Sequence, residues 1–216
     1  MEKLHRLRRE GSKSPSVDNR AHERMLAAAG YSRVAGLDEA GRGCIAGPVV
    51  AAAVILGPWY HEDITDSKLL SPTKREKLAA QIKENALAWS VGVLSEVEID
   101  RINIYQAAKT AMIDAASSLE PAPDFLLIDA MKLDGSTPFE SLVKGELHSV
   151  SIAAASILAK VTRDAIMLEM DSVHPLYGFA RHKGYCTKEH VAMLEAYGPC
   201  ALHRKTFAPV RQYYES

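Results

Sequence analysis

The segment Val49–Leu56 constrains the fold most, because it reads VVAAAVIL without a polar residue. A strand with one face in water alternates apolar and polar residues, whereas a strand covered on both faces is apolar throughout. The segment therefore predicts a buried strand between two layers. Phe125–Asp129 (FLLID) predicts a second buried strand, with an acid at its C-terminal end. Together these strands predict an α/β fold in which helices cover the sheet.

The remaining elements follow from periodicity and from capping residues. Ser71, Ser95, Asn103 and Thr187 are candidate helix N-caps, and Pro72 suits a first helical position. The predicted strands are 33–38, 49–56, 88–94, 125–129 and 142–143; the predicted helices are a short one ending at Gly30 and 72–86, 104–119, 151–173 and 187–196, with a loop at 178–185. This order predicts a mixed β-sheet, with parallel and antiparallel pairs, flanked by helices.

The domain organisation is expected to be simple. We expect residues 20–216 to form a single domain with a helical C-terminal portion from about 175. Residues 1–19 mix Lys, Arg, Ser and Pro without periodicity, which predicts a flexible basic leader that either touches phosphates or has no role.

Charge and cysteine content limit the possible classes of protein. The 26 Lys and Arg nearly balance the 27 Asp and Glu, so the whole chain presents no strong positive field that would indicate a nucleic-acid partner. Three cysteines without a C-x-x-C pair disfavour a disulfide framework and a cysteine-rich zinc site. The sequence has no run of about 18 apolar residues and no apolar signal segment. We therefore expect a cytoplasmic protein without a membrane segment.

The stretch GLDEAGRGCIAGP at 36–48 places two adjacent acids, Asp38 and Glu39, in an apolar strand just ahead of several glycines. Adjacent strand residues point to opposite faces, so only one of these acids faces a given site unless the strand bends or bulges. The glycines allow such a bend. In the alternative interpretation, the acids are a solvated strand end and the glycines form an ordinary turn.

Two further acids lie in distant segments. Asp129 ends a buried strand, at the edge where α/β sheets tend to bind ligands, unless it only caps a turn. Asp164 lies inside the alanine-rich predicted helix, where it either reaches the sheet edge or pairs with Lys160 on the surface. Jointly, Asp38, Glu39, Asp129 and Asp164 supply the oxygen ligands that Mg²⁺ prefers. Two such ions about 3.5–4 Å apart activate water and stabilise the leaving oxygen in phosphodiester hydrolysis.

Five sequence blocks, in order, resemble the signatures of ribonuclease HII between about Val34 and Pro209: GLDEAGRGCIAGPVVAAAVIL, DSKLLSPTKRE, LLIDA, SIAAASILAKVTRD and HKGYCTKEH. The resemblance implies a ribonuclease H-like fold and an endoribonuclease that uses one or two Mg²⁺ or Mn²⁺ ions. It assigns metal binding and catalysis to Asp38, Glu39, Asp129 and Asp164. It also implies that the substrates are RNA–DNA hybrids and duplex DNA cut 5′ to a single ribonucleotide, with 3′-hydroxyl and 5′-phosphate products.

The resemblance further assigns the loop Gly41, Arg42, Gly43 and the side chain of Tyr185 to the junction between ribose and deoxyribose. Backbone groups of a glycine-flanked loop can hydrogen-bond the 2′-hydroxyl, which distinguishes RNA from DNA. Tyr185 either stacks on a sugar or base or braces the loop. Lys68 resembles a lysine near the substrate phosphates, its alternative being a solvated charge, and Lys183 is a candidate phosphate contact.

Three local features qualify the resemblance. His182, Cys186 and His190 have zinc-like spacing, but a loop-to-helix boundary falls among them and no fourth ligand is evident, so zinc is not expected. Where the family often has Lys-Gly-Asp, this chain ends the motif on Glu146, which leaves its support for a second metal ion open. The terminal QYYES is unlike a sliding-clamp peptide, so we expect the compact bacterial form, a monomer without a protein partner.

Two other functions compete with this interpretation. Another ribonuclease H-like nuclease, acting on DNA junctions or only on long hybrids, would share the acids, and a panel of substrates separates it. A catalytically silent module that binds hybrids is expected to lack one of the acids, whereas all four candidates are present.

Overall fold

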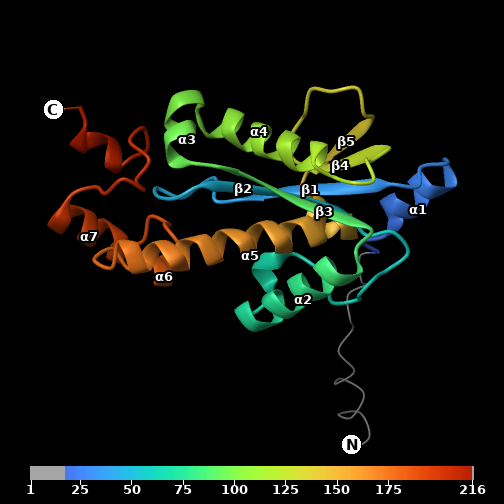
Figure 1. Ribbon diagram of the computed structural model, residues 1–216, viewed down its shortest axis with the longest axis horizontal. Coiled ribbons are helices and arrows are strands. Elements are labelled where there is room, and N and C mark those ends of the chain that lie inside the picture. Colours follow the sequence, from blue (N-terminus) through green and yellow to red (C-terminus); the bar gives the residue numbers. More distant parts are fainter. Residues whose placement is uncertain (1–17, 216) are drawn as a thin grey trace, which may run out of the picture.

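A mixed five-stranded sheet lies between two layers of helices in the computed structural model, which describes residues 18–215 (Figure 1). The strands are β1 (Val34–Ala40), β2 (Val49–Ile55), β3 (Ala88–Leu94), β4 (Phe125–Asp129) and β5 (Phe139–Leu142). They follow the order β3-β2-β1-β4-β5; the first two pairs are antiparallel and the last two are parallel. The predicted mixed sheet is therefore confirmed. Almost all of the predicted basic leader, up to residue 17, lies outside the described residues.

The helices divide between the two faces of the sheet. They are α1 (Ala21–Ala28), α2 (Pro72–Asn85), α3 (Glu96–Ile102), α4 (Ile104–Ser117), α5 (Val150–Val173), α6 (Phe179–His182) and α7 (Lys188–Tyr197), with 3₁₀ turns η1 (Ser67–Leu69), η2 (Gly145–Leu147) and η3 (Val210–Tyr213). Helices α3 and α4 cover one face, and α2 and α5 cover the other (Figure 1). The side chains of Ser71, Ser95, Asn103 and Thr187 all accept N-capping hydrogen bonds, as predicted.

Strand β2 is buried at every position, which confirms the interpretation of its continuous apolar sequence. Ala51 and Ala53 pack in the cluster that contains α4, whereas Ala52 and Val54 pack in the cluster that contains α5. Helix α5 also lies very close to β1, because a Cβ added at Gly36 would stand 2.0 Å from the carbonyl carbon of Ser151. This contact sets α5 alongside β1 and directs its later turns towards the C-terminal end of the strand.

Two segments differ from the sequence-based expectation. The predicted loop at 178–185 contains a single helical turn, α6, which begins after Gly178 in a left-handed conformation. Strand β5 spans Phe139–Leu142 rather than 142–143; it pairs with β4 at the sheet edge, where partial burial leaves no apolar pattern. Among residues 18–215, no helix is both long enough and apolar enough to cross a membrane.

Candidate active site

Asp38 and Asp129 lie together at the C-terminal ends of two parallel neighbours, β1 and β4. Leu37 is paired with Ile128, so the two acids follow at the same level of the sheet. Asp38 is 7% exposed and faces α5, where the Ser156 side chain lies beside its carboxylate. Asp129 accepts a hydrogen bond of 2.7 Å from the amide of Gly145. Both predicted acids thus occupy one sheet edge.

Glu39 joins this edge from the other face of β1. It is in register with Ala51, which packs on the α4 side, and the pairing from Gly36 to Ala40 is regular. The expected bend comes only after the strand, at Gly41, whose φ is +98°. The Glu39 carboxylate nevertheless interacts electrostatically with Asp38 and Asp129. Its Oε1 lies 3.0 Å from Arg42 Nη1, and its Oε2 is buried without a hydrogen-bond partner among the described residues.

Glu146 in η2 is the fourth carboxylate at this edge, whereas the sequence alone marks it only as a departure from the family pattern. It is 8% exposed, and its Oε2 has no hydrogen-bond partner in the described part of the chain. The neighbouring Gly145 amide ties η2 to Asp129. The missed signal was the position of β5, because Glu146 follows the strand that pairs with β4. We name Asp38, Glu39, Asp129 and Glu146 the acidic cluster.

The electrostatics of the acidic cluster favour a bound cation. Burial, followed by the charges of Glu39 and Asp129, raises the pKa of Asp38 well above its ordinary value. Burial also raises the pKa of Glu39, although Arg42 opposes the shift. Buried carboxylates that repel one another are stabilised by a hard divalent ion with oxygen ligands, and the two unpartnered oxygens fit such an ion. Within residues 18–215, no three potential ligands already converge on one point.

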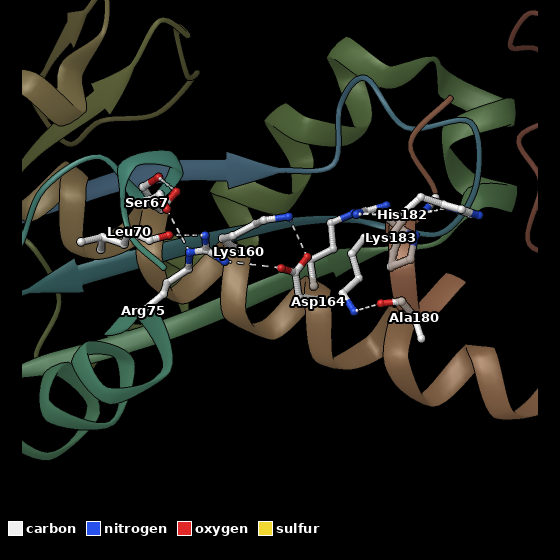
Figure 2. Close-up of polar contacts among 12 residues, drawn as sticks. Ser67, Leu70, Arg75, Lys160, Asp164, Ala180, His182 and Lys183 are labelled. Carbon is white, nitrogen blue, oxygen red and sulfur yellow. Dashed lines mark hydrogen bonds and ion pairs between the residues drawn. The ribbon is translucent and has the colours of Figure 1, made fainter. Parts of the chain in front are cut away.

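Asp164 lies outside the acidic cluster. It lies eight positions after Ser156 in α5, which corresponds to about 12 Å along the helix axis. Its Oδ1 accepts a hydrogen bond of 2.7 Å from Lys160 Nζ, and its Oδ2 lies 3.6 Å from Arg75 Nη1 (Figure 2). The alternative interpretation from the sequence, an ion pair with Lys160, is thus what the structure shows.

The turn η1 brings Lys68 to the acidic cluster. The hydroxyl groups of Ser67 and Ser156 are 2.9 Å apart, which joins the turn to α5. Arg75 donates hydrogen bonds of 2.9 Å to the carbonyls of Ser67 and Leu70 (Figure 2). Partial burial lowers the pKa of Lys68, but the charge of Asp66 and those of three members of the cluster outweigh it and raise the pKa. An exposed ammonium group therefore stands beside the carboxylates.

The loop that follows β1 exposes two free amides. Arg42 and Gly43 are exposed, and the hydrogen bonds formed among the described residues use neither of their N–H groups. A Cβ at Gly41 would lie 2.1 Å from Arg163 Nε, whereas a Cβ at Gly43 meets nothing within 4 Å. The protein itself thus requires glycine at 41 but not at 43.

Tyr185 lies beside this loop and pairs with Cys44 in an isolated antiparallel bridge. Its ring is partly exposed, with Lys160 Nζ at 5.4 Å and Arg163 Cζ at 5.9 Å from the ring centroid. The exposed ring is available for stacking, although the bridge also lets it brace the loop. Burial raises the pKa of the Tyr185 hydroxyl.

A cleft of about 810 Å³ extends from Tyr185 along α5 and α2, and its lining includes Arg75, Lys160, Asp164 and Lys183. The Nζ of Lys183 donates a hydrogen bond of 2.6 Å to the carbonyl of Ala180 (Figure 2). The cleft is therefore rich in cations, but Lys183 is turned towards its own helical turn.

The histidines of the zinc-like spacing contact protein groups. The His182 and His190 rings stack with centroids 4.2 Å apart, and Cys186 is exposed. His190 Nδ1 donates to the Tyr185 carbonyl, because a carbonyl only accepts. His190 Nε2 consequently accepts from His203 Nε2, 3.0 Å away. This hydrogen-bonded pair of histidines supports the backbone of Tyr185.

Comparisons with known proteins identify similar chains over most of this length. A family model described as Ribonuclease HII matches residues 35–210. Ribonuclease HII of Geobacillus thermodenitrificans is 56% identical over 192 residues, which are 88% of this chain and 74% of that protein. Ribonuclease HII of Acholeplasma laidlawii is 53% identical over 196 residues, 90% of this chain and 96% of that protein.

Solved structures agree with the predicted ribonuclease H-like fold. The ribonuclease H2 of Pyrococcus horikoshii OT3 superposes with a TM-score of 0.72 at 25% identity, covering 83% of this chain and 96% of the other. Bst-RNase HIII, solved in complex with Mn²⁺, has a TM-score of 0.64 at 20% identity, covering 93% and 73%. A ribonuclease HII of Archaeoglobus fulgidus, solved in complex with PCNA, has a TM-score of 0.68 at 24% identity, covering 81% and 95%.

Proposed function

The chain belongs to the ribonuclease HII family and is a ribonuclease H endonuclease, and on this basis we propose that it cuts duplex DNA 5′ to a single embedded ribonucleotide as well as RNA paired with DNA. Ribonucleases H act on RNA–DNA hybrids and depend on divalent metal ions. The observation that supports the proposal most is the position of the acidic cluster directly before a loop with two free, exposed amides.

We propose that the acidic cluster holds one or two Mg²⁺ or Mn²⁺ ions through Asp38, Glu39, Asp129 and Glu146. The raised pKa of Asp38 and the buried, unpartnered oxygens of Glu39 and Glu146 support this set. Ions bound there would lower the pKa of a water molecule and stabilise the leaving oxygen. We propose a positioning role for Asp164 in place of metal binding, because both of its oxygens face cations of the protein.

The other residues of the site bind and orient the substrate in this proposal. The amides of Arg42 and Gly43 donate to the 2′-hydroxyl, and Tyr185 stacks on the adjacent sugar or base. Lys68 neutralises the scissile phosphate, and Lys183 contacts a phosphate further along the strand after it leaves the Ala180 carbonyl. Water then attacks the phosphorus, the bond to the 3′-oxygen breaks, and that oxygen takes a proton to leave 3′-hydroxyl and 5′-phosphate ends.

Cleavage-site mapping on a DNA duplex with one ribonucleotide tests the proposal, in Mg²⁺ and in EDTA. We expect a single cut on the 5′ side of the ribonucleotide that requires Mg²⁺. The Asp38→Asn variant should lose this activity while remaining folded. Full turnover by a folded Asp38→Asn variant would refute the assignment of the site, and cleavage of long hybrids alone would favour the narrower nuclease.

A further inference from the structure

Two arginines lie fully buried beneath the loop at 41–48. Arg163 of α5 and Arg204, which follows α7, are both 0% exposed. Among residues 18–215, neither side chain forms an ion pair with a carboxylate; their donors end on backbone oxygens instead. Burying a charge without a counter-ion is costly, so these two guanidinium groups need a reason beyond packing.

All but one of the hydrogen bonds of the two arginines end on the same short loop, at 41–48. Arg163 donates to the carbonyls of Ala46, Pro48 and Lys183 at 3.0, 2.9 and 2.8 Å. Arg204 donates to the carbonyls of Gly41, Arg42, Gly47 and Pro48 at 2.7, 3.1, 3.0 and 3.2 Å. The planar guanidinium group of arginine has several donors in fixed directions, so it binds several carbonyls at once better than the ammonium group of lysine does.

The direction of these carbonyls determines the direction of the free amides. In a trans peptide, the C=O of one residue and the N–H of the next point in opposite directions. Arg204 draws the carbonyls of Gly41 and Arg42 inward, so the amides of Arg42 and Gly43 point outward. Those are the two amides without a partner among the described residues. The buried arginine thus orients the donors that the proposed function assigns to the ribose.

Arg163 links the same loop to the segment of Tyr185. Its Nη1 bonds the Lys183 carbonyl, and its Cζ lies 5.9 Å from the centre of the Tyr185 ring. Gly41 and Gly184 both lie against its side chain, where a Cβ would stand 2.1 Å and 3.4 Å from guanidinium nitrogens. The Arg163 side chain therefore fixes the distance between the loop at 41–48 and the segment of Tyr185.

From this geometry we infer that Arg163 and Arg204 are specificity-determining positioning residues, which hold the Arg42 and Gly43 amides and Tyr185 in place to recognise a ribose 2′-hydroxyl. The inference rests on the proposed cleavage at single ribonucleotides. Both residues act through the backbone and touch no substrate. The two positive charges also lie under the outward amides, where they favour the approach of a phosphate. Burial lowers the pKa of Arg204 to about 10, which keeps it charged at neutral pH.

The test measures discrimination between two duplexes of the same sequence, one all-DNA and one with a single ribonucleotide. Binding is measured by fluorescence anisotropy with Ca²⁺ in place of Mg²⁺, and discrimination is the ratio of the two Kd values. Arg204→Lys keeps the charge and loses the planar guanidinium group, so we expect discrimination to fall about five-fold, as for the loss of a hydrogen bond. Met112→Ala, in the buried core of α4, is the control that lowers stability without lowering discrimination.

The outcomes separate the inference from the function on which it rests. If the wild-type protein does not discriminate, the proposed recognition of single ribonucleotides fails, and this inference fails with it. If the wild type discriminates and folded Arg204→Lys discriminates equally well, the inference alone is refuted.

A second measurement covers the case in which Arg204→Lys does not fold. Side-chain ¹⁵N NMR of the wild type, free of nucleic acid, should show separate Nη signals with slow proton exchange for both arginines, because fixed carbonyl partners stop rotation of the guanidinium group. Averaged Nη signals would show that neither guanidinium group is held, and would overturn the inference.

Discussion

Gly41 and Gly43 lie two residues apart in the loop that follows β1, and we expect alanine to have opposite effects on stability at the two positions. At Gly41, the φ of +98° disfavours any other residue by about 1–2 kcal/mol. The added Cβ would also stand 2.1 Å from Arg163 Nε and 2.8 Å from the Pro48 carbonyl, where these two groups form a buried hydrogen bond. Loss of that charged bond adds about 1.5–3 kcal/mol. Gly41→Ala should therefore lower the free energy of unfolding by about 3–5 kcal/mol.

Gly43→Ala should leave the fold intact, because its Cβ meets no atom within 4 Å. Fewer unfolded conformations would even raise stability by about 0.4–1 kcal/mol. The methyl group would, however, stand where the ribose approaches the loop, and a displacement near 1 Å costs about 10²-fold in rate. We therefore expect a stable variant with a severe defect on the single-ribonucleotide duplex.

Urea unfolding and cleavage rates measured on both variants decide between these expectations. Wild-type cleavage by Gly43→Ala would show that the ribose does not approach this position. Equal losses of stability in the two variants would show that the loop contacts described for Gly41 and Gly43 are wrong.

Further substitutions and a change of pH test other parts of the site. Glu146→Gln should abolish the rise in Tm that Mg²⁺ produces. Asp164→Asn should keep that rise, but it should lose about 1 kcal/mol of stability because its ion pairs are lost. The reverse pattern would show that Asp164, and not Glu146, binds the metal ion. Lys68→Met should weaken hybrid binding and reduce the slope of log Kd against the logarithm of the salt concentration by about one unit. An unchanged slope would contradict a phosphate contact. Burial lowers the pKa of His190 and His203 from 6.5 to about 4, so the stability that they contribute is complete above pH 6.5 and is lost as pH falls towards 4. We expect the free energy of unfolding, measured with urea, to be about 3 kcal/mol lower at pH 4.5 than at pH 7 because of these two histidines. If His203→Gln lost as much stability between the two pH values as the wild type does, the histidines would not be the cause.

Much of the fold was predictable because its signals are local. The continuous apolar run of β2 requires two covering layers, and Ser71 and Thr187 cap helices through side chains that the sequence shows directly. Strand β5 was predicted poorly because it is short and only partly buried, so register with β4 defines it and hydrophobicity does not.

The candidate site was predictable where an acid lies at or near the C-terminal end of a strand, as Asp129 and Asp38 do. The ion pairs of Asp164 were only partly predictable, because helical spacing placed Lys160 beside it but did not reveal the contact with Arg75 of a distant helix. Glu146 was hard to place because its position depends on the pairing of β5, a contact between distant segments. The role of Arg163 was also hidden, since nothing in the sequence shows that its donors end on backbone carbonyls.

Helix α5 sets the distance between the acidic cluster and the loop that follows β1. Ser156 lies beside Asp38, and Arg163, seven positions later, binds the loop that follows β1. The two residues are therefore about 10 Å apart along the helix axis. One inserted residue between them would rotate every later side chain by about 100° and turn Arg163 away from the loop. The number of residues between Ser156 and Arg163 therefore cannot change, and any chain that keeps both parts of the site must keep this interval.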